Sequence, residues 1–172
     1  MAVARSSRRI VAPAPVIFDA GPLIALAKTG KLDVLKSLFG RVHVAPEVIA
    51  ELALQSRMPG VKEIRAGLRA GWLVRQRSPD DAEPHPFLDA GEASCTATAS
   101  RHADALLVID ERLGRQEARR IGVAITGTAG VLCAAKAHGM IDAVVPILEQ
   151  MRASGYFLGD RVIEATRRQA GE

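Results

Sequence analysis

Two aspartates each close a short apolar run, and their type and position indicate metal chemistry. Asp19 ends the run that begins at Pro15, and Asp110 ends the run that begins at Ala105. Apolar runs of this length predict strands that are buried on both faces of a parallel sheet. Because ligands of such sheets lie beyond the carboxyl ends of the strands, we expect the two carboxylates to meet there. Carboxylates in a dry site repel each other, and a divalent metal between them is the simplest remedy.

Two glutamates fall on helices that the same pattern places beside these strands. Glu51 lies on the helix after the second predicted strand, and Glu92 lies near the start of the helix that leads into the fourth. Carboxylate oxygens suit Mg²⁺ or Mn²⁺, ions that bind phosphate oxygens and lower the pKa of an attacking water. The pattern therefore predicts phosphodiester hydrolysis by four catalytic acids, of which Asp19, Glu92 and Asp110 hold the metal: Asp19, Glu51, Glu92 and Asp110.

Each acid also has a purely structural interpretation. An aspartate at a strand end can cap the following helix, which applies to Asp19 and to Asp110, whose next helix starts near Glu111. Glu92 can be a first-turn acid that complements the helix dipole, and we interpret Glu47 in that way. The joint placement of the four acids, and no single one of them, favours the metal site.

Strand-like apolar runs alternate with helical stretches, which is typical of an α/β fold with a parallel sheet. The stretch between the first two strands is broken by Thr29-Gly30 into two short helices, and Pro46 suits the first turn of the next helix. The chain is mostly helical past residue 126. Strands are predicted at residues 15–19, 41–45, 72–75, 105–110 and 123–125.

The length of 172 residues predicts one domain over residues 15–172, preceded by a flexible basic tail over residues 1–14. The tail lacks the apolar middle of a signal peptide, and no apolar run approaches the ~20 residues needed to span a bilayer. Cys95 and Cys133 are interpreted as small buried thiols, so we expect a cytoplasmic protein without membrane contact. A net charge of +4 weakly favours an acidic partner. Aromatic residues make up only 3% of the chain, so base stacking is a poor candidate for how it would bind nucleic acid.

Five segments together resemble the PIN-domain nucleases, and more narrowly their short prokaryotic branch related to VapC-type toxins. The resemblance runs from about residue 15 to the end of the chain, with the motifs in the family's order. It implies a three-layer fold with a five-stranded parallel sheet between helices, and RNA cleavage by a Mg²⁺ or Mn²⁺ site. The segments are Val16-Ile-Phe-Asp19-Ala-Gly-Pro-Leu-Ile24, Pro46-Glu-Val-Ile-Ala-Glu51-Leu52, Leu88-Asp-Ala-Gly-Glu92-Ala, Leu107-Val-Ile-Asp110-Glu111 and Thr126-Gly-Thr128-Ala-Gly-Val-Leu132.

The resemblance also implies partners and site residues. Asp19, Glu51, Glu92 and Asp110 match the positions of the family's metal-binding acids, and Glu111 is a candidate auxiliary acid. An RNA substrate and an antitoxin protein are implied partners, and a homodimer is expected from base rates. One departure is visible, because Gly21 stands where these proteins often have Ser, Thr or Asn.

Two neighbouring features could contact RNA. Arg112, Arg115 and Arg119 share one helix face and could steer an RNA backbone, although a solvated face paired with Glu117 is an equal alternative. Thr126 and Thr128 open a helix that their hydroxyls are expected to cap, and whose N-terminus could hold a phosphate.

Two other classes of function compete with the nuclease. The first is a PIN-like module that has lost useful catalysis and acts through protein or RNA binding, an interpretation that Gly21 favours. The second is a phosphatase of the haloacid-dehalogenase type, which also starts from an aspartate after the first strand. That chemistry needs a second aspartate two residues later, and Gly21 occupies that position, so we consider it the weaker alternative.

Overall fold

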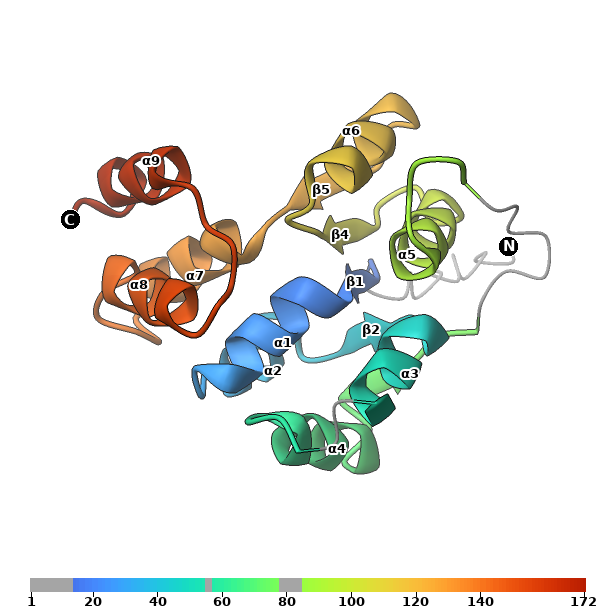
Figure 1. Ribbon diagram of the computed structural model, residues 1–172, viewed down its shortest axis with the longest axis horizontal. Helices are drawn as coiled ribbons and strands as arrows, with labels where there is room; N and C mark the ends of the chain where they lie inside the picture. The colour runs from blue at the N-terminus through green and yellow to red at the C-terminus, as the bar shows by residue number, and fades with distance from the viewer. Residues whose placement is uncertain (1–13, 55–56, 78–84) are drawn as a thin grey trace, which may run out of the picture.

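Five short parallel strands form a single sheet in the computed structural model, which describes residues 14–54, 57–77 and 85–172 (Figure 1). The strand order is β3-β2-β1-β4-β5, so the strand that carries Asp19 is central. The predicted α/β fold with a five-stranded parallel sheet flanked by helices is confirmed. The predicted basic tail lies outside the described residues, Ala14 excepted. The strands are β1 (Val16–Phe18), β2 (Val42–Val44), β3 (Leu73–Arg75), β4 (Leu106–Val108) and β5 (Ala124–Thr126).

Helices connect the strands at the points where the sequence predicts them. The first connection splits into two helices around Thr29, and the next helix begins at Pro46, as predicted. None of the helices in the described part of the chain is long and apolar enough to cross a bilayer. The helices are α1 (Ala20–Lys28), α2 (Asp33–Phe39), α3 (Pro46–Leu54), α4 (Val61–Arg69), α5 (Ala90–Ser100), α6 (Arg112–Arg120), α7 (Thr128–Ala137), α8 (Val145–Ala153) and α9 (Asp160–Ala170).

The small-residue helix α5 packs directly on β1 and β4. Its Ala, Ser and Thr side chains let the helix approach the sheet closely, and the buried Cys95 Sγ lies 3.6 Å from the carbonyl oxygen of Phe18. Burial raises the pKa of the Cys95 thiol, which suits the predicted role of an inert core residue. Cys133 differs from the prediction, because it is only half-buried.

The last three helices form a group, drawn in orange and red in Figure 1, that meets the sheet's first helix α1 through α7 and α8. α1 packs against α7 and α8, and α9 packs against α7 and α8 in turn. This arrangement brings the segment between α8 and α9 to the start of α1, where Tyr156 approaches Gly21. Residues near the two ends of the described chain therefore meet at the carboxyl edge of the sheet.

Candidate metal-binding active site

The register of the sheet brings the two strand-end aspartates to one edge. β1 pairs with β4 so that Phe18 lies opposite Val108, and the Asp19 amide donates a hydrogen bond to the Val108 carbonyl at 3.0 Å. One strand further out, the Ile109 amide donates to the Thr126 carbonyl at 3.0 Å. Because these strands are parallel, the residues that follow them all leave the sheet on the same side.

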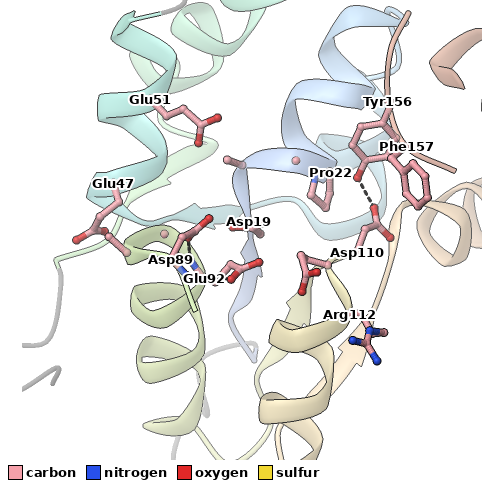
Figure 2. A pocket seen from close by; sticks show the side chains of 15 residues that line it. Asp19, Pro22, Glu47, Glu51, Asp89, Glu92, Asp110, Arg112, Tyr156 and Phe157 are labelled. Atoms are coloured by element: carbon pink, nitrogen blue, oxygen red, sulfur yellow. Dashed lines mark hydrogen bonds between the residues drawn. The ribbon is translucent and has the colours of Figure 1, made fainter. Parts of the chain in front are cut away.

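A cleft of about 660 Å³ opens at this edge, and all four predicted catalytic acids line it. Figure 2 shows Asp19 near its centre, with Glu51 and Glu92 on the surrounding helices and Asp110 beyond the end of β4, its carboxylate turned toward Tyr156. The lining residues are Asp19, Ala20, Gly21, Pro22, Glu47, Glu51, Asp89, Ala90, Gly91, Glu92, Asp110, Glu111, Arg112, Tyr156 and Phe157.

Asp19 is a buried carboxylate that does not serve as a helix cap. It occupies the N-cap position of α1, yet its side chain makes no capping hydrogen bond. One reason is that the third residue of the helix is Pro22, which has no backbone N–H to donate. Burial is the main cause that raises the Asp19 pKa to about 7; the backbone amides of Ala20 and Gly21 offset part of this rise, and the charges of Asp89 and Glu92 add to it. The cleft therefore holds negative charge at close quarters.

Asp110 is held firmly by the start of α7. The Thr128 amide donates to both carboxylate oxygens, at 3.0 Å to Oδ1 and 3.2 Å to Oδ2. The Thr128 hydroxyl and the Tyr156 hydroxyl each donate to Oδ2 at 2.5 Å. Asp110, which follows another strand, thus caps α7. The prediction that the hydroxyls of Thr126 and Thr128 cap this helix is wrong. The same contact engages the Thr128 amide at the helix N-terminus where, from the sequence, a phosphate could bind.

Glu111 and Glu92 line the cleft and also cap helices. Glu111, rather than Asp110, is the N-cap of α6, and its carboxylate accepts from the Leu113 and Gly114 amides. Glu92 forms a reciprocal capping box with Asp89, with the Glu92 amide 2.8 Å from Asp89 Oδ1. Burial, and after it the charges of Asp89 and Glu111, raises the pKa of Glu92. The structural interpretation of Glu92 is therefore confirmed, and the position of both acids in the lining leaves their predicted chemical roles open.

Two carboxylates in the lining were not among the predicted site residues. Asp89 lies close enough to Asp19 for its charge to raise the Asp19 pKa. Its signal was present in the sequence, since Asp89 and Glu92 have the spacing of a capping box ahead of a helix. Glu47 lies one turn before Glu51 on α3, and that four-residue spacing places both on the same helix face.

The three arginines of α6 separate into different environments. Arg112 is exposed and lines the cleft, so it alone of the three is placed to meet a substrate. Arg115 folds back and donates from Nη1 to the Ile109 carbonyl at 2.7 Å, next to Asp110. Arg119 is exposed but does not line the cleft. Glu117, which the alternative interpretation paired with these three arginines, forms its ion pair with Arg120.

Tyr156 is a residue of the site that the sequence analysis did not predict, because no motif in the sequence points to it. It comes from the segment between α8 and α9, and Figure 2 shows its hydroxyl directed at Asp110. Burial, and then the charge of Asp110, raises the Tyr156 pKa, so the hydroxyl keeps its proton and acts as a donor. Its neighbour Phe157 is 93% exposed at the rim of the cleft.

The residues of the cleft fit a divalent cation by the chemistry of their donors. The donors around Asp19 are carboxylate oxygens, which Mg²⁺ and Mn²⁺ prefer, and the charges of Asp89 and Glu92 add to the effect of burial in raising the Asp19 pKa. Within residues 14–54, 57–77 and 85–172, no three acidic, His or Cys side chains already converge as a metal-binding group. The acids therefore line the cleft without converging on one point. Such a site suits Mg²⁺, because this ion usually keeps several of its waters and binds few carboxylates directly.

The fold is a parallel α/β sheet flanked by helices, with an acidic cleft at the carboxyl edge of the sheet. A family model described as "PIN domain" matches residues 15–172, and the chain belongs to that family, whose members are generally metal-dependent nucleases. No curated protein matches the chain in sequence. Among solved structures, a PilT N-terminus domain protein from the hyperthermophilic archaeon Sulfolobus solfataricus P2 has a similar fold, with a TM-score of 0.54 and 15% identity. That similarity covers 70% of this chain and 92% of the archaeal one.

Proposed function

We propose that this PIN-domain protein is a metal-dependent endoribonuclease that hydrolyses RNA phosphodiesters in the acidic cleft. The observation that carries the proposal is Asp19, a buried carboxylate at the centre of a cleft that other carboxylates line. Burying a carboxylate is costly for the fold, and burial raises the Asp19 pKa to about 7, so a role in binding a cation explains its position.

The position of each side chain in the cleft suggests its role in the proposed reaction. Asp19, Glu92 and Asp110 would hold Mg²⁺ or Mn²⁺, and Glu51 would assist from the exposed side of the cleft. When bound, the metal supplies a charge that polarises the phosphate and lowers the pKa of a water. Thr128 and Tyr156 fix the Asp110 carboxylate. The guanidinium of Arg112 would attract the RNA backbone to the rim.

Metal removal is the direct test of this proposal. Purified protein is incubated with end-labelled RNA in Mg²⁺ or Mn²⁺, and with EDTA in a parallel reaction. We expect cleavage with either metal, loss of cleavage in EDTA, and recovery when excess Mn²⁺ is added back. DNA of the same sequence in the same assay compares the two substrates. Cleavage that persists in EDTA would contradict the proposed chemistry.

Arg112 provides a milder test of the substrate path. Replacing the exposed Arg112 with Ala should raise KM for RNA by up to about fivefold, the equivalent of ~1 kcal/mol for one exposed ion pair. The value of kcat should stay close to that of the wild type, and KM should depend less on salt. Arg119→Ala is the matched control, because Arg119 is exposed on the same helix and does not line the cleft. Equal effects of both substitutions would remove Arg112 from the substrate path.

The rival function is a binding module without catalysis. It rests on Gly21 and on acids that, among the described residues, surround the cleft instead of converging. Titration with Mn²⁺ by calorimetry separates the two, because a nuclease must bind the ion saturably and a pure binding module need not. RNA binding without Mn²⁺ binding would favour the module.

A further inference from the structure

The Tyr156 hydroxyl and the Thr128 hydroxyl contact the same oxygen of the Asp110 carboxylate. Tyr156 donates to Asp110 Oδ2 at 2.5 Å, and that oxygen also accepts from the Thr128 hydroxyl at the same distance. With Oδ2 engaged twice by hydroxyls, the rotation of the Asp110 carboxylate is fixed, and Oδ1 is left with the single Thr128 amide among the described contacts. An oxygen with spare acceptor capacity is the one best placed to serve a cation.

Gly21 lies next to this hydroxyl. A Cβ added at position 21 would lie 3.5 Å from the Tyr156 hydroxyl oxygen and 3.9 Å from Asp19 Oδ2. Both distances are ordinary van der Waals contacts, so the Cβ of a small side chain fits there. Position 21 is therefore a place from which a second hydroxyl can be introduced beside Tyr156 and Asp19.

We propose that Tyr156 is a positioning residue of the cleft: its hydroxyl fixes the Asp110 carboxylate, and a serine introduced at position 21, beside that hydroxyl, can take over this role. This inference deepens the proposed function and rests on it for its kinetic readout. The ring of Tyr156 packs against the core, so Tyr156→Phe keeps the packing and removes the hydroxyl alone. Side chains that orient a metal ligand in this way typically contribute about 10- to 100-fold in metal affinity or activity.

The experiment compares Tyr156→Phe with two double variants, Gly21→Ser/Tyr156→Phe and Gly21→Ala/Tyr156→Phe. The readouts are the dissociation constant for Mn²⁺ by calorimetry, and kcat and KM on labelled RNA. We expect Tyr156→Phe to weaken Mn²⁺ binding or lower kcat by about tenfold or more, with KM nearly unchanged. The serine double variant should regain most of the loss, whereas the alanine double variant, which adds a Cβ without a hydroxyl, should not.

A control separates positioning from a general loosening of the segment. Leu158→Val shortens a buried neighbour outside the cleft lining, so it should lower the melting temperature and leave Mn²⁺ affinity unchanged. Wild-type Mn²⁺ affinity and kcat in Tyr156→Phe would overturn the inference. Equal rescue by serine and alanine, or none by serine, would overturn the link to position 21.

The two proposals fail in distinguishable ways. If the wild type binds Mn²⁺ but cleaves no RNA, the nuclease proposal fails and the Mn²⁺ affinities of the variants still decide the role of Tyr156. If the wild type does not bind Mn²⁺, both proposals fail.

Discussion

Asp19→Asn and Asp110→Asn should each lower RNA cleavage at least about 100-fold, because each removes a charge that holds the cation. Both substitutions keep the shape of the side chain. The amide side chain in Asp110→Asn would still accept from the Thr128 amide through its carbonyl oxygen, so the start of α7 should stay folded. The measurement is the initial rate on labelled RNA in Mn²⁺, with circular dichroism of each variant.

Asp104→Asn is the matched control for these two substitutions. Asp104 is exposed and precedes β4, so it lies at the opposite edge of the sheet from the cleft. Its rate should equal that of the wild type. Full activity in both Asp19→Asn and Asp110→Asn would show that the cleft is not the site of hydrolysis.

The same substitution at Asp19 should stabilise the metal-free fold at high pH. The Asp19 pKa is about 7 in the folded protein and 3.8 ordinarily, so the folded state binds its proton more tightly than the unfolded state. The free energy of unfolding of the wild type therefore falls as pH rises between these two values. Asp19→Asn escapes this cost, and its melting temperature should exceed that of the wild type at pH ~8, with the difference vanishing near pH ~4. A lower melting temperature of the variant under the alkaline condition would contradict the burial argument.

Gly127→Ala should lower cleavage by about 100-fold through a displacement of Asp110. The backbone at Gly127 is extended, with φ at −130°, so alanine is tolerated by the chain itself. The added Cβ would collide with Asp110 Oδ1 and come within 3.0 Å of Arg115 Nη1. Asp110 must then rotate and give up its hydrogen bonds to Thr128. Rates on RNA and the dissociation constant for Mn²⁺ measure the effect.

Gly159→Ala supplies the control for this glycine. It also precedes a helix with an ordinary φ of −72°, and its added Cβ meets no atom within 4 Å. Its rate should match the wild type. If Gly127→Ala also matches the wild type, the fixed orientation of Asp110 is not needed for the reaction.

The strand-end aspartates show what sequence can predict about this site. Asp19 and Asp110 follow apolar runs, and parallel pairing alone suffices to carry both to one edge of the sheet. Glu51 and Glu92 follow from their places on the helices beside those strands. All four acids line the cleft. In a parallel sheet the helix after each strand begins at the carboxyl edge, so the order of strands and helices already places these acids near that edge.

The contacts between distant segments could not be predicted in the same way. Tyr156 reaches Asp110 because α8 packs beside α1 and the chain then turns back toward the cleft, and no local pattern encodes that return. The choice of cap is ambiguous in the sequence for a related reason. Asp110 and Glu111 are adjacent in sequence, and only the position of β5 decides that one caps α7 and the other α6. Arg115 has the spacing of a substrate contact, and only the fold shows that the Ile109 carbonyl engages it.

The contribution of Tyr156 to the cleft also sets the order in which the site can be assembled during translation. Domains begin to fold from the N-terminus as they leave the ribosome. A nascent chain that has not yet extended past α8 has all five strands and the acids of the cleft, but it lacks the tyrosine that fixes Asp110. The growing polypeptide, which is surrounded by ribosomal and messenger RNA, therefore completes its cleft only after the segment that follows α8 has been made.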